Sequence, residues 1–256
     1  FAPIAYLFIG SLKPNDQVLA GLSGFIPRHL SFRNYAKVFE TFNSDSTGYF
    51  WRFYLNSIII SSVIVIAGLF VNSAAAFALA RLRWHGRNII LGVVVLLTIL
   101  PFEAIAVPLY GLLNGYRNTL QVQILPFIAS AFSIFLFYTF FIGLPKEVQE
   151  AARIDGAGPW RTFFKVIIPM SKPVFASVTI LSFLAAWNSF LFPLMMVDSA
   201  DVRPLPLAMS VFYLQQQKEW GTIFAFGVLL VIPVMTVFLS FQKFFIQSVA
   251  SSAVKG

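Results

Sequence analysis

The chain has 256 residues, of which 58% are hydrophobic and only 11% are charged, and its mean hydropathy is +0.80. Soluble globular domains carry about 25% charged residues, so this composition predicts an integral membrane protein instead. The formal net charge of +8 comes without the Lys/Arg-rich run that a nucleic-acid interface needs, and basic residues at the ends of membrane spans explain it better. Because cysteine is absent, a disulfide framework and a cysteine zinc site are excluded.

The first predicted elements are a shortened span and a polar loop. Apolar sequence begins at Phe1 without the charged leader and small-residue cleavage site of a signal peptide. Residues 1–12 are therefore predicted to be the outer part of a first span, whose beginning lies before Phe1. Residues 13–52 are predicted to form a polar loop with a short helix at 34–42.

Five further spans are predicted in chain order. Residues 53–80 contain no Asp, Glu, Lys or Arg, and at about 1.5 Å per residue they exceed a hydrocarbon core of about 30 Å. The other spans are predicted at 88–112, 119–143, 173–197 and 221–242, with a polar loop between the last two. The prediction is a single all-α transmembrane domain over residues 1–256, with six spans.

Orientation follows from the basic residues. Segments 81–88, 144–172 and 243–256 hold ten of the 18 Lys and Arg residues, in fewer positions than the opposite segments. Cytoplasmic loops carry an excess of Lys and Arg, so these three segments and both termini are predicted to be cytoplasmic.

The longest polar stretch in the second half of the chain is EAARIDGAGPWRTFFKVIIPM, residues 150–170. A helix is predicted to begin at Pro145, because proline suits a first helical position and acidic residues suit the positive end of the helix dipole. A break is predicted at Gly156, Gly158 and Pro159. A second helix is predicted at 160–168 and is expected to stop at Pro169.

The spacing of this stretch resembles a family motif. Glu150-Ala151-Ala152, three residues, Gly156, nine residues and then Val166-Ile167-Ile168-Pro169 is similar to the EAA loop of inner-membrane permeases of binding-protein-dependent ABC importers. The family pattern has Ile where this chain has Val166, and Leu where it has Ile168. Both departures are mild apolar exchanges.

Three other segments resemble the carbohydrate-uptake branch of that family, and its maltose-type second permease in particular. They are residues 101–119, the WNSF segment that starts at Trp187, and the terminal AVKG segment from Ala253. In the second segment Ser189 stands where aspartate is usual, so one negative charge of the family segment is absent here.

The resemblance implies a permease subunit in a bacterial or archaeal inner membrane, with ATP and Mg on separate ATPase subunits rather than on this chain. The implied partners are a second homologous permease, an ATPase dimer and an extracytoplasmic solute-binding protein, the last at the external loop 198–220. The residues implied to couple to the ATPase are Glu150, Ala151, Ala152, Ile154, Asp155, Gly156 and Pro169. The tail residues Val254, Lys255 and Gly256 are implied to contact the ATPases as well.

Polar residues inside predicted spans are functional candidates. Glu103 is the only acidic residue clearly within a span, near Pro101, and the rise along a straight helix places it in the outer third of the membrane. It is hypothesised to border the translocation path, together with Asn188; a structural carboxyl satisfied inside the bundle is the alternative. For Asn56 and Asn72, hydrogen bonding between helices is favoured over contact with the solute.

The predicted function is ATP-driven import of a mono-, di- or oligosaccharide by alternating access. Glycerol-3-phosphate or a glycerophosphodiester is the alternative solute, and an ion-coupled secondary carrier is the less favoured class. The chain has no G-x-x-x-x-G-K-[ST] motif for nucleotide phosphates, and no catalytic motif or set of metal ligands. It is therefore predicted to be a transport subunit and not an enzyme.

Overall fold

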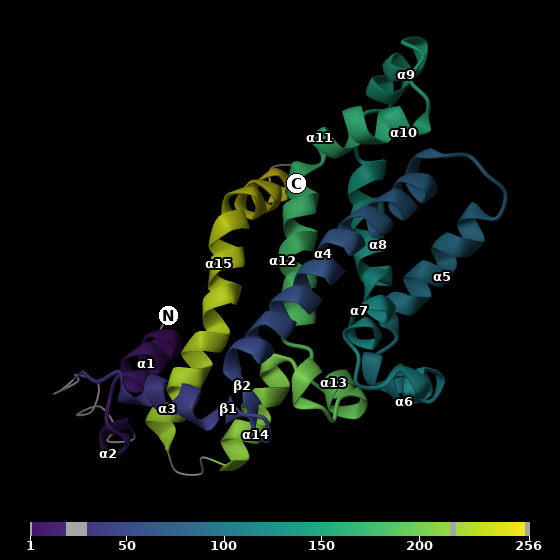
Figure 1. Ribbon diagram of the computed structural model, residues 1–256. Coiled ribbons are helices and arrows are strands. Elements are labelled where there is room, and N and C mark those ends of the chain that lie inside the picture. Colours follow the sequence, from purple (N-terminus) through teal and green to yellow (C-terminus); the bar gives the residue numbers. More distant parts are fainter. Residues whose placement is uncertain (1, 19–29, 216–218, 254–256) are drawn as a thin grey trace. The chain divides into compact units, whose positions relative to one another are not determined.

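The computed structural model describes residues 2–18, 30–215 and 219–253 (Figure 1). The tail residues Val254, Lys255 and Gly256 lie outside the described residues. The chain divides into two compact units. The first comprises Phe1–Ile60, Leu113–Gln123 and Trp187–Thr236, and the second comprises Ser61–Leu112, Ile124–Ala186 and Val237–Gly256.

Four helical segments in the described residues are long and apolar enough to cross a membrane, and a fifth is a bent pair. They are α4 (Phe50–Arg81), α7 with α8 (Leu120–Ile128 and Ala131–Ile142), α12 with α13 (Lys172–Trp187 and Leu191–Met196), and α15 (Trp220–Ala253) as far as Lys243. These segments confirm the apolar helices predicted at 53–80, 119–143, 173–197 and 221–242. The helix at the start of the chain, α1 (Ala2–Ser11), is apolar but short.

The third predicted span is not one straight helix. α5 (Arg87–Ile99) is followed by α6 (Phe102–Leu113), and the two axes differ in direction by 104°. The break lies at Leu100, which is extended with φ −70° and ψ 119°, since the proline after it disfavours a helical conformation. The prediction of a continuous helix at 88–112 was therefore wrong, and the height of Glu103, which was counted along a straight helix, stays a prediction without that basis.

The loop before α4 contains short elements of the first unit. α2 (Asn15–Val18) follows α1, and α3 (Arg33–Thr41) confirms the short helix predicted at 34–42. β1 (Asn43–Ser44) and β2 (Gly48–Tyr49) then pair antiparallel in a small hairpin that leads into α4.

The segment predicted as a polar loop between α13 and α15 contains a helix. After η4 (Ala200–Val202), α14 (Leu205–Gln215) is apolar, and its Leu205 and Phe212 side chains are fully buried. The prediction of a loop was wrong because this stretch joins the core of the first unit, and that burial outweighs the breakers in its sequence.

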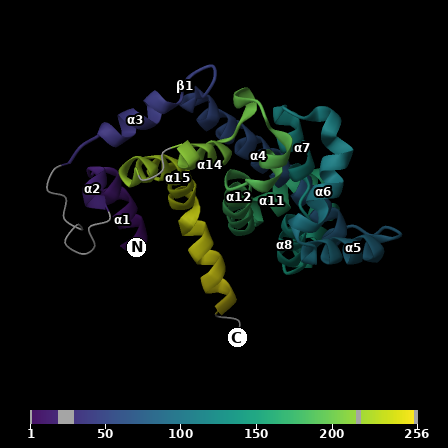
Figure 2. The ribbon, with the colours of Figure 1, turned by 90° about the horizontal axis from the view of Figure 1, so that it is seen from below.

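Each unit has its own apolar core. In the first unit, Phe42, Phe53, Phe212 and Phe226 form a cluster with ring centroids 5.2 to 6.2 Å apart. In the second unit, α8 packs against α5 (Figure 2), and a buried cluster gathers around Phe137, Phe141 and Phe163.

Two buried asparagines join separate segments, as the sequence predicted. Asn56 donates to the carbonyl oxygens of Asp201 and Arg203, at 2.9 and 3.0 Å. Asn72 donates to the carbonyl of Ile128 at 3.0 Å and accepts from the amide of Ser130 at 2.9 Å. The latter two groups flank the break between α7 and α8, where backbone groups without a helical partner must be satisfied by other bonds.

We predict that Asn72→Ala destabilises the protein by about 1–2 kcal/mol, because two hydrogen bonds worth roughly 0.6 kcal/mol or more each are lost in an apolar environment. The measurement is unfolding in mixed detergent micelles. Thr98→Ala is the matched control, since within the described residues the Thr98 hydroxyl donates to the carbonyl of Val95 in its own helix. An equal loss in both variants would contradict the role of Asn72.

A salt bridge ties α3 to the start of α15 in the first unit. The Lys37 ammonium pairs with the Glu219 carboxylate, whose second oxygen accepts from the Thr222 hydroxyl at 3.3 Å. The hydrogen bond from Lys37 lowers the pKa of Glu219, although partial burial of the carboxylate acts in the opposite direction.

Since the pKa of Glu219 is depressed in the folded state, the pair stabilises the protein above the ordinary glutamate pKa of about 4.3 and stops doing so as pH falls through the lower folded value. We predict a small loss of stability as pH falls below about 4.3, and this loss is reduced in Lys37→Gln. Thermal unfolding at several pH values measures it, with Lys172→Gln as control. Identical pH profiles for Lys37→Gln and the unmodified protein would contradict the linkage.

Candidate functional site

The predicted coupling residues lie on a helical hairpin in the second unit, here called the EAA hairpin (Lys146–Met170). Its first limb is α9 (Lys146–Ile154), with Pro145 at the N-cap rather than inside the helix and Glu147 in the first turn. Figure 1 shows α9 and α10 side by side beyond the end of α8, and the two limbs are in contact.

The turn of the EAA hairpin is a closed helix C-terminus. The amide of Ala157 donates to the carbonyl of Ala152 at 2.9 Å, and the amide of Gly156 donates to that of Arg153 at 3.0 Å. This pair of bonds is the Schellman motif, which requires a left-handed residue after the helix. Gly156 supplies it with φ +77°, a conformation that costs other residues about 1 kcal/mol or more. The predicted break at this glycine is confirmed.

The second limb runs from Pro159 to Met170 and is more continuous than the sequence indicated. It comprises α10 (Pro159–Thr162), a π-helical turn η3 (Phe163–Ile167) and α11 (Ile168–Met170). The prediction that Pro169 stops the helix after residue 168 was wrong, because Pro169 lies inside α11. It is tolerated because it occupies the first turn of α11, where a backbone N–H is dispensable.

One side of the EAA hairpin is anchored and the other is exposed. Phe163 and Ile167 are buried in the core of the second unit, and Ala152 is 9% exposed. By contrast, Ile154 is 87% exposed and Trp160 is 60% exposed.

An arginine at the end of α4 donates hydrogen bonds to the backbone just before the EAA hairpin. The Arg81 guanidinium donates to the carbonyl oxygens of Phe141 and Leu144, at the C-terminus of α8. Basic side chains at a helix C-terminus satisfy its free carbonyls and complement the dipole. Arg81 therefore links α4 to the residues that lead into α9.

The structure brings most of the predicted coupling residues together on the hairpin turn. Those with exposed side chains are Glu150, Ala151, Ile154 and Asp155, which precede the exposed Gly156. Ala152 faces inward instead. Pro169 is exposed at the far end of the second limb, away from the turn in sequence.

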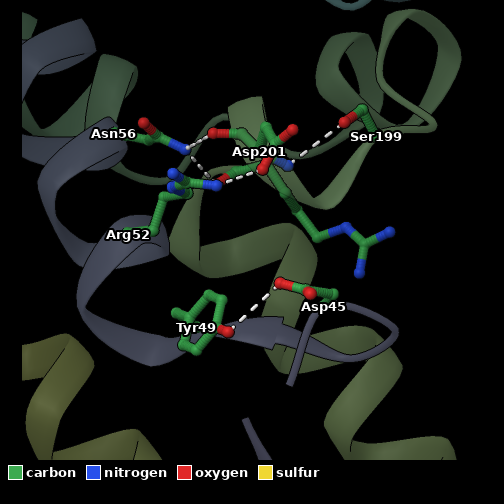
Figure 3. Close-up of polar contacts among 7 residues, drawn as sticks. Asp45, Tyr49, Arg52, Asn56, Ser199 and Asp201 are labelled. Atoms are coloured by element: carbon green, nitrogen blue, oxygen red, sulfur yellow. Dashed lines mark hydrogen bonds and ion pairs between the residues drawn. The ribbon is translucent and has the colours of Figure 1, made fainter. Parts of the chain in front are cut away.

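A second polar site lies in the first unit, where the segment after α13 meets α4. Figure 3 shows Arg52 paired with the Asp201 carboxylate and Asn56 donating to the Asp201 carbonyl. In the neighbouring hairpin, Tyr49 donates to Asp45 at 3.1 Å, which raises the pKa of the Tyr49 phenol. β2, which carries Tyr49, contacts η4, which carries Asp201.

Asn118 fixes the other end of this segment. It has a positive φ of 57°, and its side-chain oxygen accepts from the amides of Asp198 and Ser199 at 2.7 and 2.9 Å. Arg117 pairs with the Asp198 carboxylate at 2.8 Å. Residues 198–203 are therefore held in a defined shape, although both acidic side chains of the segment remain largely exposed.

The two residues predicted to border the translocation path lie in different units, and each is exposed. Glu103 is in the first turn of α6, directly after the bend at Pro101. Asn188 follows the last residue of α12, Trp187, whose buried indole donates to the carbonyl of Leu230 in α15 at 3.1 Å.

Sequence reasoning missed the contribution of Arg81, the last residue of α4, to the site. In the sequence analysis, the basic residues at 81–88 were used only to assign orientation. In the structure, Arg81 donates to the backbone just before the EAA hairpin. A basic residue at the last position of a long apolar helix was the signal that could have identified it.

Comparisons with known proteins identify related chains. The family described as binding-protein-dependent transport system inner membrane component matches residues 64–251, which include the whole EAA hairpin. A crystal structure of a bacterial ABC transporter involved in the import of the acidic polysaccharide alginate has a similar chain. The TM-score is 0.78 at 25% identity, over 95% of this chain and 90% of that one.

Three curated relatives are similar over 99% of this chain. The arabinooligosaccharides transport system permease protein AraQ of Halalkalibacterium halodurans is 32% identical, with 91% of its length covered. The diacetylchitobiose uptake system permease protein NgcG of Streptomyces coelicolor is 33% identical, with 83% covered. The trehalose/maltose transport system permease protein MalG of Thermococcus litoralis is 32% identical, with 91% covered.

The sequence resemblance, the apolar helices and the EAA hairpin thus point to the same family as these matches. This chain belongs to the inner-membrane components of binding-protein-dependent transport systems.

Proposed function

We propose that this chain is a permease subunit of an ATP-driven importer that moves a sugar across the membrane by alternating access. The observation that carries the proposal is the EAA hairpin, with a buried anchor and an exposed turn, in a chain that belongs to this transport family. The curated relatives named above transport arabinooligosaccharides, diacetylchitobiose or trehalose and maltose, which supports a carbohydrate as the solute.

The proposed complex has two homologous permeases, two ATPase subunits that bind ATP and Mg, and an extracytoplasmic solute-binding protein. Six spans are proposed, with α1 as the end of the first and the bent pair α5–α6 as the third. Both termini and the EAA hairpin then face the cytoplasm. The hairpin turn, Glu150 to Gly156, is proposed to dock on an ATPase subunit, and Val254, Lys255 and Gly256 are proposed to reach the ATPases as well.

The anchoring of the hairpin supports its use as a lever. Phe163 and Ile167 lock the second limb into the core of the second unit, and Arg81 fixes the residues before the first limb. A displacement at the turn is therefore passed to α4 and α8 rather than absorbed in a loose loop. ATP binding by the partner shifts the permease only by the difference in docking free energy between its two conformations.

The external side of the proposed complex uses residues 198–203. Their exposed carboxylates, Asp198 and Asp201, are positioned by Arg117, Arg52 and Asn118. A segment with a fixed shape loses little conformational entropy on association, which suits the proposed contact with a solute-binding protein.

We predict that Glu150→Lys and Gly156→Asp each abolish uptake while the protein remains in the membrane. Charge reversal at Glu150 opposes docking, and a side chain at Gly156 strains its positive φ. Space is not the limit there, because no atom lies within 4 Å of an added Cβ. Uptake of labelled sugar in cells and the amount of permease in membranes are measured together.

Gly158→Ala is the matched control, because Gly158 has φ −70° and open space around its Cβ. Its uptake is expected to remain normal. Uptake by the unmodified protein is expected to stop on ATP depletion and to survive an ionophore. Normal uptake in Glu150→Lys and Gly156→Asp would refute docking at the turn, and loss of uptake with the ionophore alone would indicate an ion-coupled carrier.

Glu103 and Asn188 are proposed to border the translocation path. Glu103 is exposed at the start of α6 and has no salt-bridge partner among the described residues. We predict that Glu103→Gln lowers sugar uptake at unchanged membrane level, because the charge is lost with little change in shape. Unaltered uptake at unaltered level would eliminate this role, and Glu147→Gln serves as a comparison outside the apolar segments.

A further inference from the structure

A cationic cavity lies beside the EAA hairpin, entirely within the second unit. Its volume is about 550 Å³, and it is lined by residues from the end of α4, the start of α5 and α9. The charged side chains that line it are Arg81, Arg83, Arg87, Lys146, Arg153 and Glu150. Five cations face one carboxylate, so the cavity carries a strong positive potential.

Within the described part of the chain, none of the five cations that line the cavity forms a salt bridge. The salt bridges of the described residues are Lys37–Glu219, Arg52–Asp201 and Arg117–Asp198, and none of them includes a residue that lines the cavity. Because the cations that line the cavity outnumber its carboxylate by five to one, the cavity is suited to an anion.

A second hollow, of about 480 Å³, shares Arg83 and Arg87 with the first and extends past Trp84 to Ile89. From there, an exposed apolar stripe follows α5. Ile89 is 73% exposed, Val93 45% and Leu96 65%, and their spacing places them on one helix face. The cationic site thus continues into a surface that suits an acyl chain.

The position of the cavity relative to the apolar helices also favours a lipid. Arg81 is the last residue of α4, a helix long enough to cross a membrane, and Trp84 follows shortly after it. Arginine and tryptophan at the end of a span lie at the level of the lipid headgroups. Basic pockets between helix ends at that level bind anionic headgroups, and arginine binds phosphate with paired hydrogen bonds.

We infer that this cavity binds the phosphate headgroup of an anionic phospholipid, whose acyl chain lies along the exposed face of α5. The inference rests only on the insertion of this chain in a membrane and is independent of the transported solute. Free inorganic phosphate shares the headgroup chemistry but leaves the α5 stripe uncovered. An acidic side chain of a partner subunit would satisfy the arginines and would also leave that stripe bare.

The test is native mass spectrometry of the protein, purified with whichever subunits accompany it, after exchange into equal amounts of phosphatidylglycerol and phosphatidylcholine. Selective retention of phosphatidylglycerol is expected. In Arg83→Gln/Arg87→Gln, the preference is expected to fall about 30-fold, because two cationic contacts at a membrane surface are lost. Lys146→Gln, on the opposite side of the cavity, gives an independent and smaller loss.

Lys165→Gln/Lys172→Gln is the control, since it removes two exposed cations of the second unit that do not line the cavity. Retention like that of the unmodified protein is expected in this control. The inference is overturned by equal retention of both lipids, by an equal loss in control and cavity variants, or by displacement of the lipid with inorganic phosphate. Retention that appears only after partner subunits are removed also overturns it, because the cavity then belongs to a subunit contact.

Discussion

The need to satisfy backbone polar groups inside an apolar protein constrains this structure more than any other factor. A helix that crosses a membrane satisfies its own N–H and C=O groups, but each break exposes some of them where no water is available. Asn72 bonds the backbone at the break between α7 and α8, and Arg81 bonds the carbonyls where α8 ends. Because these side chains come from α4, the breaks also fix how α4 packs on its neighbours.

The same constraint explains how the EAA hairpin is both rigid and available. Its turn satisfies its own carbonyls through the Schellman bonds at Gly156, so the turn needs no protein contact on its outer side. Its second limb is held by Phe163 and Ile167 in the core. A hairpin built in this way leaves Ile154 exposed without loss of shape.

The differences between prediction and structure arise where local pattern and tertiary packing disagree. Hydropathy located the apolar segments, yet it could not detect the 104° bend at Pro101, because the residues on both sides are equally apolar. It also assigned α14 to a loop. The free energy gained by burying Leu205 and Phe212 depends on a core that α4 and α15 build, and hydropathy along the chain does not contain that information. Pro169 does not end the second limb, because it lies in the first turn of α11, where a backbone N–H is dispensable.

The sequence by itself determined the membrane class, the apolar helices, the EAA spacing and the break at Gly156, because each depends on composition or on neighbours a few residues apart. The grouping of the exposed residues that are predicted to couple to an ATPase on one turn follows from that local pattern. Only the tertiary structure decided that Arg81 closes the end of α8 and that Arg83, Arg87 and Lys146 line one cavity. These residues are far apart along the chain, and the packing of α4, α5 and α9 brings their charges together.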